Sequence, residues 1–325
     1  MTRLICLLQL IFIAPSVAQD KTALPEMLGW ANFHLPANVQ SVYTIQYAIR
    51  LQDRVMPDST VFVDTLLTKS KETNYTFNEH GHLLSLRSDS FDEKGKTIVS
   101  RETKYHYGPE DKLSGVVRFV DDKMSDSVYI GYNRHGKVDE QLYYDRKGRK
   151  EGRVQYFYRN NRVFNVKIRD RDEVLLSFVR YEYDAAGNLV KKEINGNTLQ
   201  YESSLKYSYD TLDNGYVQIN EYDYAGQYKI MGMHGKVYDK EGRLVEFNVA
   251  DSNKRIVESG TIKYNERGLP VSELTFAMYK YDYSYLYEYD ENGYWKTRRM
   301  LEQGKPIRKT HRVTEFFKET AGSFD

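Results

Sequence analysis

The sequence predicts an all-β protein, an antiparallel up-and-down meander of about 18–20 strands in a curled or spiral sheet. Three observations lead to this fold class. A short phrase recurs nine times, a second turn signal falls between most consecutive hairpins, and apolar and charged residues alternate between the turns. The phrase is an aromatic residue, Asp or Asn, two variable residues and Gly. Its copies begin at Phe77, Phe91, Tyr132, Tyr144, Tyr183, Tyr222, Tyr238, Tyr264 and Tyr289.

Each copy of the phrase has the composition of a hairpin turn. Asp or Asn at the first position and Gly at the fourth are preferred in a type I β-turn, where the Asx side chain caps the turn backbone. The Gly supplies a left-handed residue, which forms a bulge where the return strand begins. An apolar residue follows two places after the Gly, as at Leu83, Leu189 and Trp295. Each phrase is therefore predicted to be a hairpin tip.

One subset of the turns is regularly spaced along the chain. Weaker turns after Tyr107, Tyr158 and Tyr209 complete a series whose aromatic residues are mostly 25 or 26 residues apart. The series is Phe77, Tyr107, Tyr132, Tyr158, Tyr183, Tyr209, Tyr238, Tyr264 and Tyr289. Other turn signals lie between its members, the weakest near Ala277. Since a meander turns alternately at its two ends, each repeat unit is two strands of roughly 8–10 residues.

Side-chain alternation predicts two different faces for this sheet. The residues two places before the tips are mostly aromatic or apolar: Tyr75, Tyr105, Ile130, Tyr156, Tyr181, Tyr207, Lys236, Ile262 and Tyr287. Because side chains alternate with period two, these residues share a face with the tip aromatics. The residues between them, such as Arg180, Glu182 and Lys206, are polar. One face is therefore a ladder of aromatic residues and the other faces water.

A sheet of this length needs a way to cover its aromatic face. Twisted sheets of more than about ten strands usually curl, split or close. We expect a curled or spiral sheet with the Tyr face inward, and a two-layer arrangement is the alternative. An outer-membrane barrel is disfavoured, because Lys, Arg and Glu recur near the strand centres where a lipid face needs an apolar band.

The N-terminal residues 1–18 have the composition of an export signal. Arg3 precedes the apolar run Leu4–Ala14, and Ser16-Val17-Ala18 has the small residues that signal peptidase requires, so cleavage is expected after Ala18. The run is too short to span a membrane as a helix. Cys6, the only cysteine, lies within it, so the mature chain would lack disulfides and thiolate sites. We expect a periplasmic or secreted protein without a membrane span in the mature chain.

The remaining boundaries follow from the repeats. Residues 19–74 are expected to form an N-terminal cap and the first strands, with a short helix or irregular arm at Leu24–Trp30 and strands over Val39–Arg50 and Val61–Lys69. The repeat array takes up residues 75–305 without a linker, which favours one elongated domain. Residues 306–325 would be a last strand, from Lys305 to Phe317, and a frayed tail.

The form Tyr-Asp-x-x-Gly-x-Leu resembles the YD repeat of the RHS family and of related repeat proteins of the Bacteroidetes cell envelope. Its best copies are residues 183–189 and 238–244, and residues 289–295 are similar to a terminal copy. The resemblance covers about residues 75–300 and implies a spiral, shell-like β-sheet. In large RHS proteins such a shell encloses a toxin domain. This chain has no toxin-sized segment and no C-terminal processing region, so that role does not carry over.

Composition and motifs argue against catalysis and nucleic-acid binding. Lys and Arg (47) nearly balance Asp and Glu (46), so no uniformly basic surface is expected. The chain has no Gly-x-Ser-x-Gly elbow, phosphate-binding loop or dinucleotide fingerprint. A glycoside hydrolase would need a carboxylate pair across a cleft, but most candidate Asp residues already have a turn role: Asp92, Asp145, Asp184, Asp239 and Asp290. We expect a non-enzyme without a cofactor.

His80-Gly81-His82, on the first hairpin tip, is the strongest metal-binding pattern in the sequence, with His106 before the next tip. A closed zinc site normally has four ligands, and no third ligand lies nearby in the sequence. The remaining histidines are scattered and none has the i, i+4 spacing of a helical metal motif. Exposed turn histidines are the simpler interpretation, and we predict no metal site.

A tyrosine-rich strand is the best candidate for ligand or partner binding. Tyr279, Tyr281, Tyr283, Tyr285, Tyr287 and Tyr289 alternate with other residues and would share one face. Tyrosine has a flat apolar body and a hydrogen-bonding tip, which suits stacking on sugars or a protein partner, although the core of the repeat sheet is the simpler interpretation of the stripe. Short sequences such as Asp126-Ser127-Val128 resemble the Bacteroidetes O-glycosylation sequon. The sequence therefore favours a scaffold or interaction surface, with glycan binding as the alternative and a hydrolase third.

Overall fold

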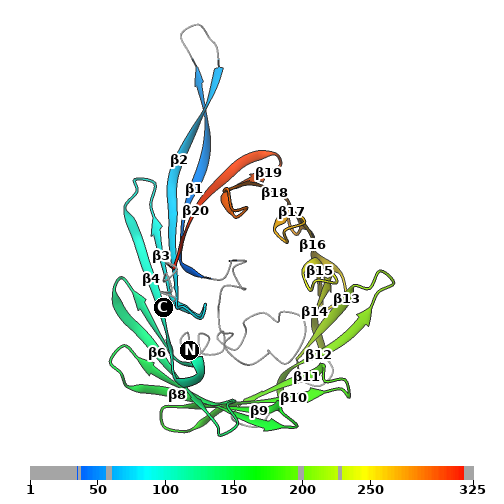
Figure 1. The fold of residues 1–325 in the computed structure, drawn as a ribbon. Coiled ribbons are helices and arrows are strands. Elements are labelled where there is room, and N and C mark those ends of the chain that lie inside the picture. Colours follow the sequence, from blue (N-terminus) through cyan, green and yellow to red (C-terminus); the bar gives the residue numbers. More distant parts are fainter. Residues whose placement is uncertain (1–34, 36–37, 56–60, 197–200, 226–228, 318–325) are drawn as a thin grey trace, which may run out of the picture. The chain divides into compact units, whose positions relative to one another are not determined.

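The computed structural model describes residues 35, 38–55, 61–196, 201–225 and 229–317, and these form an antiparallel meander of 20 strands (Figure 1). The first ten strands are β1 (Val39–Val55), β2 (Val61–Phe77), β3 (Leu83–Phe91), β4 (Thr97–Tyr107), β5 (Leu113–Val120), β6 (Lys123–Tyr132), β7 (Val138–Asp145), β8 (Lys150–Arg159), β9 (Arg162–Asp170) and β10 (Leu175–Tyr183). The others are β11 (Leu189–Gly196), β12 (Tyr201–Thr211), β13 (Val217–Ala225), β14 (Lys229–Tyr238), β15 (Leu244–Asp251), β16 (Ile256–Tyr264), β17 (Pro270–Phe276), β18 (Lys280–Tyr289), β19 (Trp295–Glu302) and β20 (Lys305–Phe316). The predicted all-β meander and its strand number are confirmed.

Contacts within the chain divide these strands into two compact units. Unit 1 contains the described residues of 129–282, and unit 2 those of 27–128 and 283–325. The boundaries fall inside β6 and β18, whereas the sequence suggested boundaries at the ends of the repeat array. Long-range strand pairing, which repeat spacing does not reveal, decides which strands of unit 2 belong together.

In unit 2, the first and last strands of the described chain are hydrogen-bonded neighbours. β1 pairs with β2 on one side and with β20 on the other, so that Val42 lies opposite both Tyr75 and Thr314. β2 then continues to β3, β4 and β5, and β20 continues to β19 and β18. Because residues 39–48 of β1 pair with residues 308–316 of β20, neither strand has an unpaired edge in this stretch to which another strand could add. The sequence pattern does not predict this pairing.

The β1–β2 hairpin is longer than expected. Both strands have 17 residues and continue beyond the predicted ends at Arg50 and Lys69. Only part of each strand has an outer neighbour, because β20 pairs with β1 up to Ala48 and β3 pairs with β2 from Lys71 onward. The rest pairs within the hairpin alone and extends past the neighbouring strands in Figure 1. Leu66 and Leu67 on this extension are exposed.

Unit 1 contains a run of consecutive antiparallel ladders, in which each strand from β7 to β16 pairs with the next. A register shift occurs at many of the tips, such as between Glu182 and Tyr183 where the return strand begins at Leu189. This shift is the bulge that the Gly of the phrase was expected to produce. The pairing of sequence neighbours is the connectivity that alternating turn signals predict.

The turns have the geometry that the phrase predicts. At Asp145, the Gly148 amide donates to the Asp145 carbonyl at 2.9 Å, and the Asp145 amide donates to the Arg149 carbonyl at 2.9 Å. Asp145 Oδ1 also accepts from the amides of Lys147 and Arg149, at 2.8 and 3.0 Å. The same pattern recurs at Asn78, Asp92, Asn133, Asp239, Asn265 and Asp290. The glycines have φ between 72° and 95°, a region that L-residues rarely adopt.

The tip tyrosines have a second role, which links each hairpin to the one before it. Tyr183 donates its hydroxyl to the Val163 carbonyl at 2.9 Å, one repeat earlier in the chain. The same bond is made by Tyr107 to Leu83, Tyr158 to Val138, Tyr209 to Leu189 and Tyr264 to Leu244. In four of these bonds the acceptor is the first residue of a return strand, and in the fifth it is Val163, the second residue of β9. We call these bonds the tyrosine latches.

Burial confirms that the strands have two different faces. Tyr181 and Tyr156 are each 4% exposed, whereas Arg180 and Glu182, beside Tyr181 in sequence, are exposed. In unit 2 the buried residues Val39, Val42, Phe77 and Leu83 form a hydrophobic cluster, with Tyr75 and Tyr105 packed against it. The apolar side chains thus lie on the face that carries the tip aromatics, as predicted.

The export signal with cleavage at Ala18, the cysteine and the expected segment at Leu24–Trp30 lie outside the described residues. In the described part of the chain, no helix is both long and apolar enough to cross a membrane. A short 3-10 segment, Pro109–Asp111, lies between β4 and β5.

Candidate functional site

The tyrosine stripe lies mostly on β18. Tyr281, Tyr283, Tyr285, Tyr287 and Tyr289 alternate along this strand and are half-buried. Tyr279 lies outside it, because β17 and β18 are joined by a turn in which the Ala277 amide donates to the Tyr279 carbonyl at 3.0 Å. Tyr279 is 69% exposed. Tyr281 belongs to unit 1, and the stripe from Tyr283 onward belongs to unit 2.

In unit 2, β19 places an arginine and a tryptophan beside the stripe. Arg298 lies opposite Tyr287 in the β18–β19 register, and Trp295 lies opposite Tyr289. The Trp295 ring contacts Tyr287 edge to face, with centroids 6.3 Å apart. The Arg298 guanidinium carbon is 5.8 Å from the ring centroids of both Trp295 and Tyr285. These are distances at which a cation interacts favourably with an aromatic face.

A second arginine, on β20, completes this arrangement. Arg312 is only 7% exposed, and its guanidinium carbon lies 4.2 Å from the Trp295 ring centroid. Burial lowers the pKa of Arg312 to about 10, and the negative charge of Asp290 offsets part of this effect. No salt bridge to Arg312 occurs within the described ranges. A buried cation held mainly by an aromatic ring is poorly compensated, which favours contact with an anion.

Two polar atoms beside these rings have no hydrogen-bond partner among the described residues. They are Nε of Arg298 and Oγ1 of Thr310, both buried. The two residues are opposite each other in the β19–β20 register, so the two unused groups come from adjacent strands. We call Tyr285, Tyr287, Trp295, Arg298, Thr310 and Arg312 the arginine–aromatic face. Donors and cations beside flat rings suit a ligand with hydroxyl and carboxylate groups.

The sequence indicated only the tyrosines of this face. Arg298, Thr310 and Arg312 were not expected, because their position depends on how β19 and β20 are registered against β18. Period-two alternation would place Arg298 and Met300 on one face of β19, but it does not say which neighbouring residues they meet.

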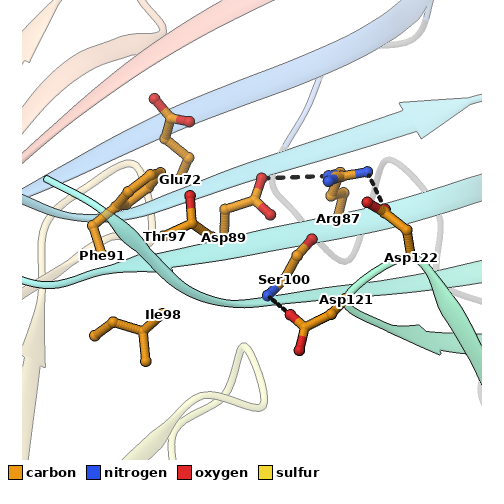
Figure 2. Close-up of a pocket in the computed structure, with 9 residues that line it drawn as sticks. All are labelled: Glu72, Arg87, Asp89, Phe91, Thr97, Ile98, Ser100, Asp121 and Asp122. Atoms are coloured by element: carbon orange, nitrogen blue, oxygen red, sulfur yellow. Dashed lines mark hydrogen bonds and ion pairs between the residues drawn. The ribbon is translucent and has the colours of Figure 1, made fainter.

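A second feature of unit 2 is an open depression of about 550 Å³ over β2, β3 and β4 and the turn after β5. Figure 2 shows Arg87 reaching two carboxylates from this depression, with Nε 3.4 Å from Asp89 and a terminal nitrogen 3.1 Å from Asp122. Asp121 accepts from the Ser100 amide at 2.9 Å. The lining residues are Glu72, Arg87, Asp89, Phe91, Thr97, Ile98, Ser100, Asp121 and Asp122.

These contacts assign structural roles to the acidic groups of the depression. Asp121 and Asp122 form a two-residue turn with φ of 50° and 59°, and Arg87 ties this turn to β3. Three of the four carboxylates are held by an arginine or a backbone amide. These carboxylates therefore stabilise the turn and the strands around it, and they are not arranged as a catalytic pair on either side of a substrate.

His80 and His82 lie on the β2–β3 turn, as expected. Asp111, from the turn between β4 and β5, lies beside them, and the three side chains offer ligand atoms within 4.8 Å of one another. His106 is not part of this group. Asp111 is 29 residues from His82 in the sequence, so only the pairing of β3 with β4 brings it near.

No family model matches this chain. No curated protein matches it either. Among solved structures, it is similar to a porin-like protein from Bacteroides uniformis, with 9% identity, a TM-score of 0.34, and coverage of 86% of this chain and 97% of that one. It is also similar to a porin-like protein from Bacteroides vulgatus, with 14% identity, a TM-score of 0.32, and coverage of 63% and 98%. Likenesses this weak transfer neither architecture nor function to this chain.

Proposed function

We propose that this chain is a non-catalytic, exported β-repeat protein of the cell envelope that acts as a scaffold or interaction surface. The observation that carries the proposal is how the repeated residues are used. The Asp, Asn and Gly of the phrase are engaged in turn hydrogen bonds, and several tip tyrosines are engaged in the latches. A sequence that uses most of its repeated polar groups to hold the sheet together is specialised for presenting a surface.

The resemblance to YD repeats and the export signal favour a location in the periplasm or outside the cell. The proposal keeps the expected curled sheet but not an open spiral, because the first and last strands, β1 and β20, are paired. The depression of Figure 2 adds support for a non-enzyme, because its carboxylates are mostly committed to Arg87 and to backbone amides. The hydrolase remains the third candidate, without a geometric observation in its favour.

Glycan binding is the second candidate, and the arginine–aromatic face favours it. The unused donor of Arg298 and the unused hydroxyl of Thr310 lie beside aromatic rings, as in sites that stack sugars and hold their polar groups. The buried charge of Arg312 indicates an acidic glycan in particular. Glycan binding would make the interaction surface specific for acidic sugars without any catalysed reaction.

The test compares binding by the purified protein and by variants on a glycan array that includes uronic acids. The Tyr283→Ala/Tyr285→Ala pair removes stacking surface, and Arg298→Gln removes the unused donor. Leu286→Ala is the matched control, because Leu286 lies on the same strand, is 55% exposed and points to the other face. Glycan binding predicts that the first two variants lose retention and the control keeps it.

Two other results separate the candidates. If the protein retains no glycan but captures a defined envelope protein in a pull-down, the scaffold proposal holds and glycan binding fails. Retention that is equal in all the variants would show that the arginine–aromatic face is not the site.

A further inference from the structure

Two neighbouring turns of unit 2 bring together three metal-ligating side chains. His80 and His82 come from the β2–β3 turn, and Asp111 ends the 3-10 segment between β4 and β5. His80 Nδ1 lies 2.6 Å from Asp111 Oδ2. One ligand atom from each of the three residues lies within 4.8 Å of the other two. Among the described residues, this is the one such group of three.

The β2–β3 turn holds both histidines through its backbone. Asn78 Oδ1 accepts from the amides of His80 and His82, at 3.1 and 2.8 Å. Gly81 between them has φ of 83° and donates to the Asn78 carbonyl at 2.9 Å. The turn lies directly after Phe77, which is 2% exposed, so the hydrophobic cluster of unit 2 anchors it. The two imidazoles therefore project from a rigid hairpin.

Aromatic packing orients the second histidine. The His82 ring stacks on Tyr107, with centroids 5.0 Å apart and planes 23° apart, and it meets the His80 ring edge to face at 6.3 Å. Tyr107 is itself held by its latch to the Leu83 carbonyl. Supporting contacts of this kind fix the orientation of a ligand before the ion arrives.

The His82 ring also has an unused nitrogen. Its Nδ1 is buried and has no hydrogen-bond partner in the part of the chain that the structure describes. Leaving a buried imidazole nitrogen unpaired is costly, so a natural protein usually gives such an atom a partner. A metal ion is a suitable partner, because His80 and Asp111 offer an imidazole nitrogen and a carboxylate oxygen within 4.8 Å of a ring nitrogen of His82.

We propose that His80, His82 and Asp111 bind one divalent transition-metal ion of the zinc type. Two imidazole nitrogens and one carboxylate oxygen are a ligand set that Zn²⁺ accepts, and three protein ligands leave a fourth position for water or a partner group. Ligand atoms about 2.1 Å from a tetrahedral ion lie about 3.4 Å apart. The 2.6 Å contact between His80 and Asp111 therefore opens slightly as the ion enters, and the wider separations close.

The ion would join the β2–β3 turn to the β4–β5 turn at one end of unit 2. His80 and Asp111 are both more than a third exposed, so the ion has access from solvent. Glu110 and Asp111 both have left-handed backbones, with φ of 61° and 55°, and the ion would hold this unfavourable turn in place. The site is independent of the arginine–aromatic face and of the function proposed above.

The experiment titrates the purified, metal-free protein with Zn²⁺ by calorimetry and with Co²⁺ by visible absorption. One equivalent of each ion is expected to bind, and the Co²⁺ complex should show the absorption of a four- or five-coordinate ion with nitrogen ligands. His80→Ala, His82→Gln and Asp111→Asn should each weaken binding by about tenfold or more. Acidic buffer should also weaken it, because imidazole binds metal only when neutral.

His135→Ala is the matched control, because His135 occupies the same position of its own turn as His80 and lacks a second histidine two residues on. His106→Ala removes a histidine from the strand that precedes Asp111. Both controls should bind one equivalent as the unchanged protein does. Circular dichroism verifies folding, and the exposed positions of His80 and Asp111 keep these two variants informative if His82→Gln is unfolded. Absence of binding, or equal binding by Asp111→Asn and the controls, would overturn the proposal.

Discussion

At the scale of single residues, the first Asx of each turn shows how one side chain determines local structure. Asp145 Oδ1 accepts two backbone amides of its turn, and Oδ2 accepts from the Arg149 side chain at 2.6 and 2.9 Å. The hydrogen bonds from Arg149 are the main reason that the pKa of Asp145 falls to about 2, and the turn amides contribute further. Asp239 with Arg243 and Asp251 with Arg255 repeat this arrangement.

The lowered pKa of Asp145 predicts a pH dependence of stability. A carboxyl whose pKa is lower in the folded state stabilises the fold fully above its unfolded pKa of about 4, and this contribution is lost as the pH falls toward about 2. Asp145→Asn should therefore flatten the decline of the melting temperature between these pH values. Thermal melts followed by circular dichroism measure the effect.

The control for this prediction is Asp139→Asn, which removes an exposed carboxyl from the same strand. It should leave the slope of melting temperature against pH unchanged in this interval. A decline as steep in Asp145→Asn as in the unchanged protein would show that the Asp145 carboxylate does not stabilise the turn.

At the scale of elements, the tyrosine latches explain why the aromatic residue of the phrase is so often tyrosine. A phenylalanine would fill the same space on the buried face but could not donate to the preceding return strand. The residue before the acceptor is often a cation that lies over the tyrosine ring. The guanidinium carbon of Arg162 is 5.6 Å from the Tyr183 ring centroid, and that of Arg243 is 5.1 Å from the Tyr264 ring centroid. The latches therefore add a side-chain bond between adjacent strands of successive hairpins, at the end of the sheet where the tips lie.

Removing one latch should destabilise the protein without changing its fold. Tyr183→Phe deletes the hydroxyl that bonds to the Val163 carbonyl and keeps the ring under Arg162. The expected loss is about 1 kcal/mol of unfolding free energy, the usual contribution of a hydrogen bond. Urea denaturation measures it. Tyr129→Phe is the control, since Tyr129 is 50% exposed, and an equal loss there would contradict the role of the latch.

At the scale of the whole molecule, pairing between the two ends of the described chain is decisive. β20 lies between β19 and β1, and the buried residues Val39 and Val42 of β1 form one cluster with Phe77 of β2 and Leu83 of β3. β20 thus covers the outer edge of the strand that carries half of this cluster. The first strand therefore depends on the last strand to pair its outer edge, although more than 250 residues separate their paired positions.

Deletion of residues 305–325 should therefore cause self-association. The deletion leaves β19 and β1 as unpaired edges, which are templates for other strands. Light scattering after size-exclusion chromatography should find oligomers or aggregates of the shortened chain. Deletion of residues 318–325 alone is the control and should leave the oligomeric state unchanged. A shortened chain with the oligomeric state and cooperative unfolding of the full chain would contradict the role of β20.

Local rules were enough to predict much of this fold from the sequence. The Asx and Gly positions predicted the turns, and the period-two pattern separated Tyr181 from Arg180, because both signals depend on residues a few positions apart. The lengths of β1 and β2 were underestimated, since a repeat phrase marks only one of their four ends, at Phe77. Of the candidate sites, the sequence indicated the tyrosine stripe and interpreted His80-Gly81-His82 as exposed turn histidines. It did not indicate Arg298, Arg312 or Asp111, whose positions depend on strand register.

The sequence by itself determined the kind of protein: an antiparallel meander, its hairpin tips, and which face of each strand is apolar. These properties follow from backbone preferences and side-chain alternation, which act within one strand or turn. Only the tertiary structure decided that β1 pairs with β20, that Asp111 joins His80 and His82, and that two arginines meet Trp295. Those contacts depend on which strands become neighbours and in which register, and a one-residue shift would send each side chain to the opposite face.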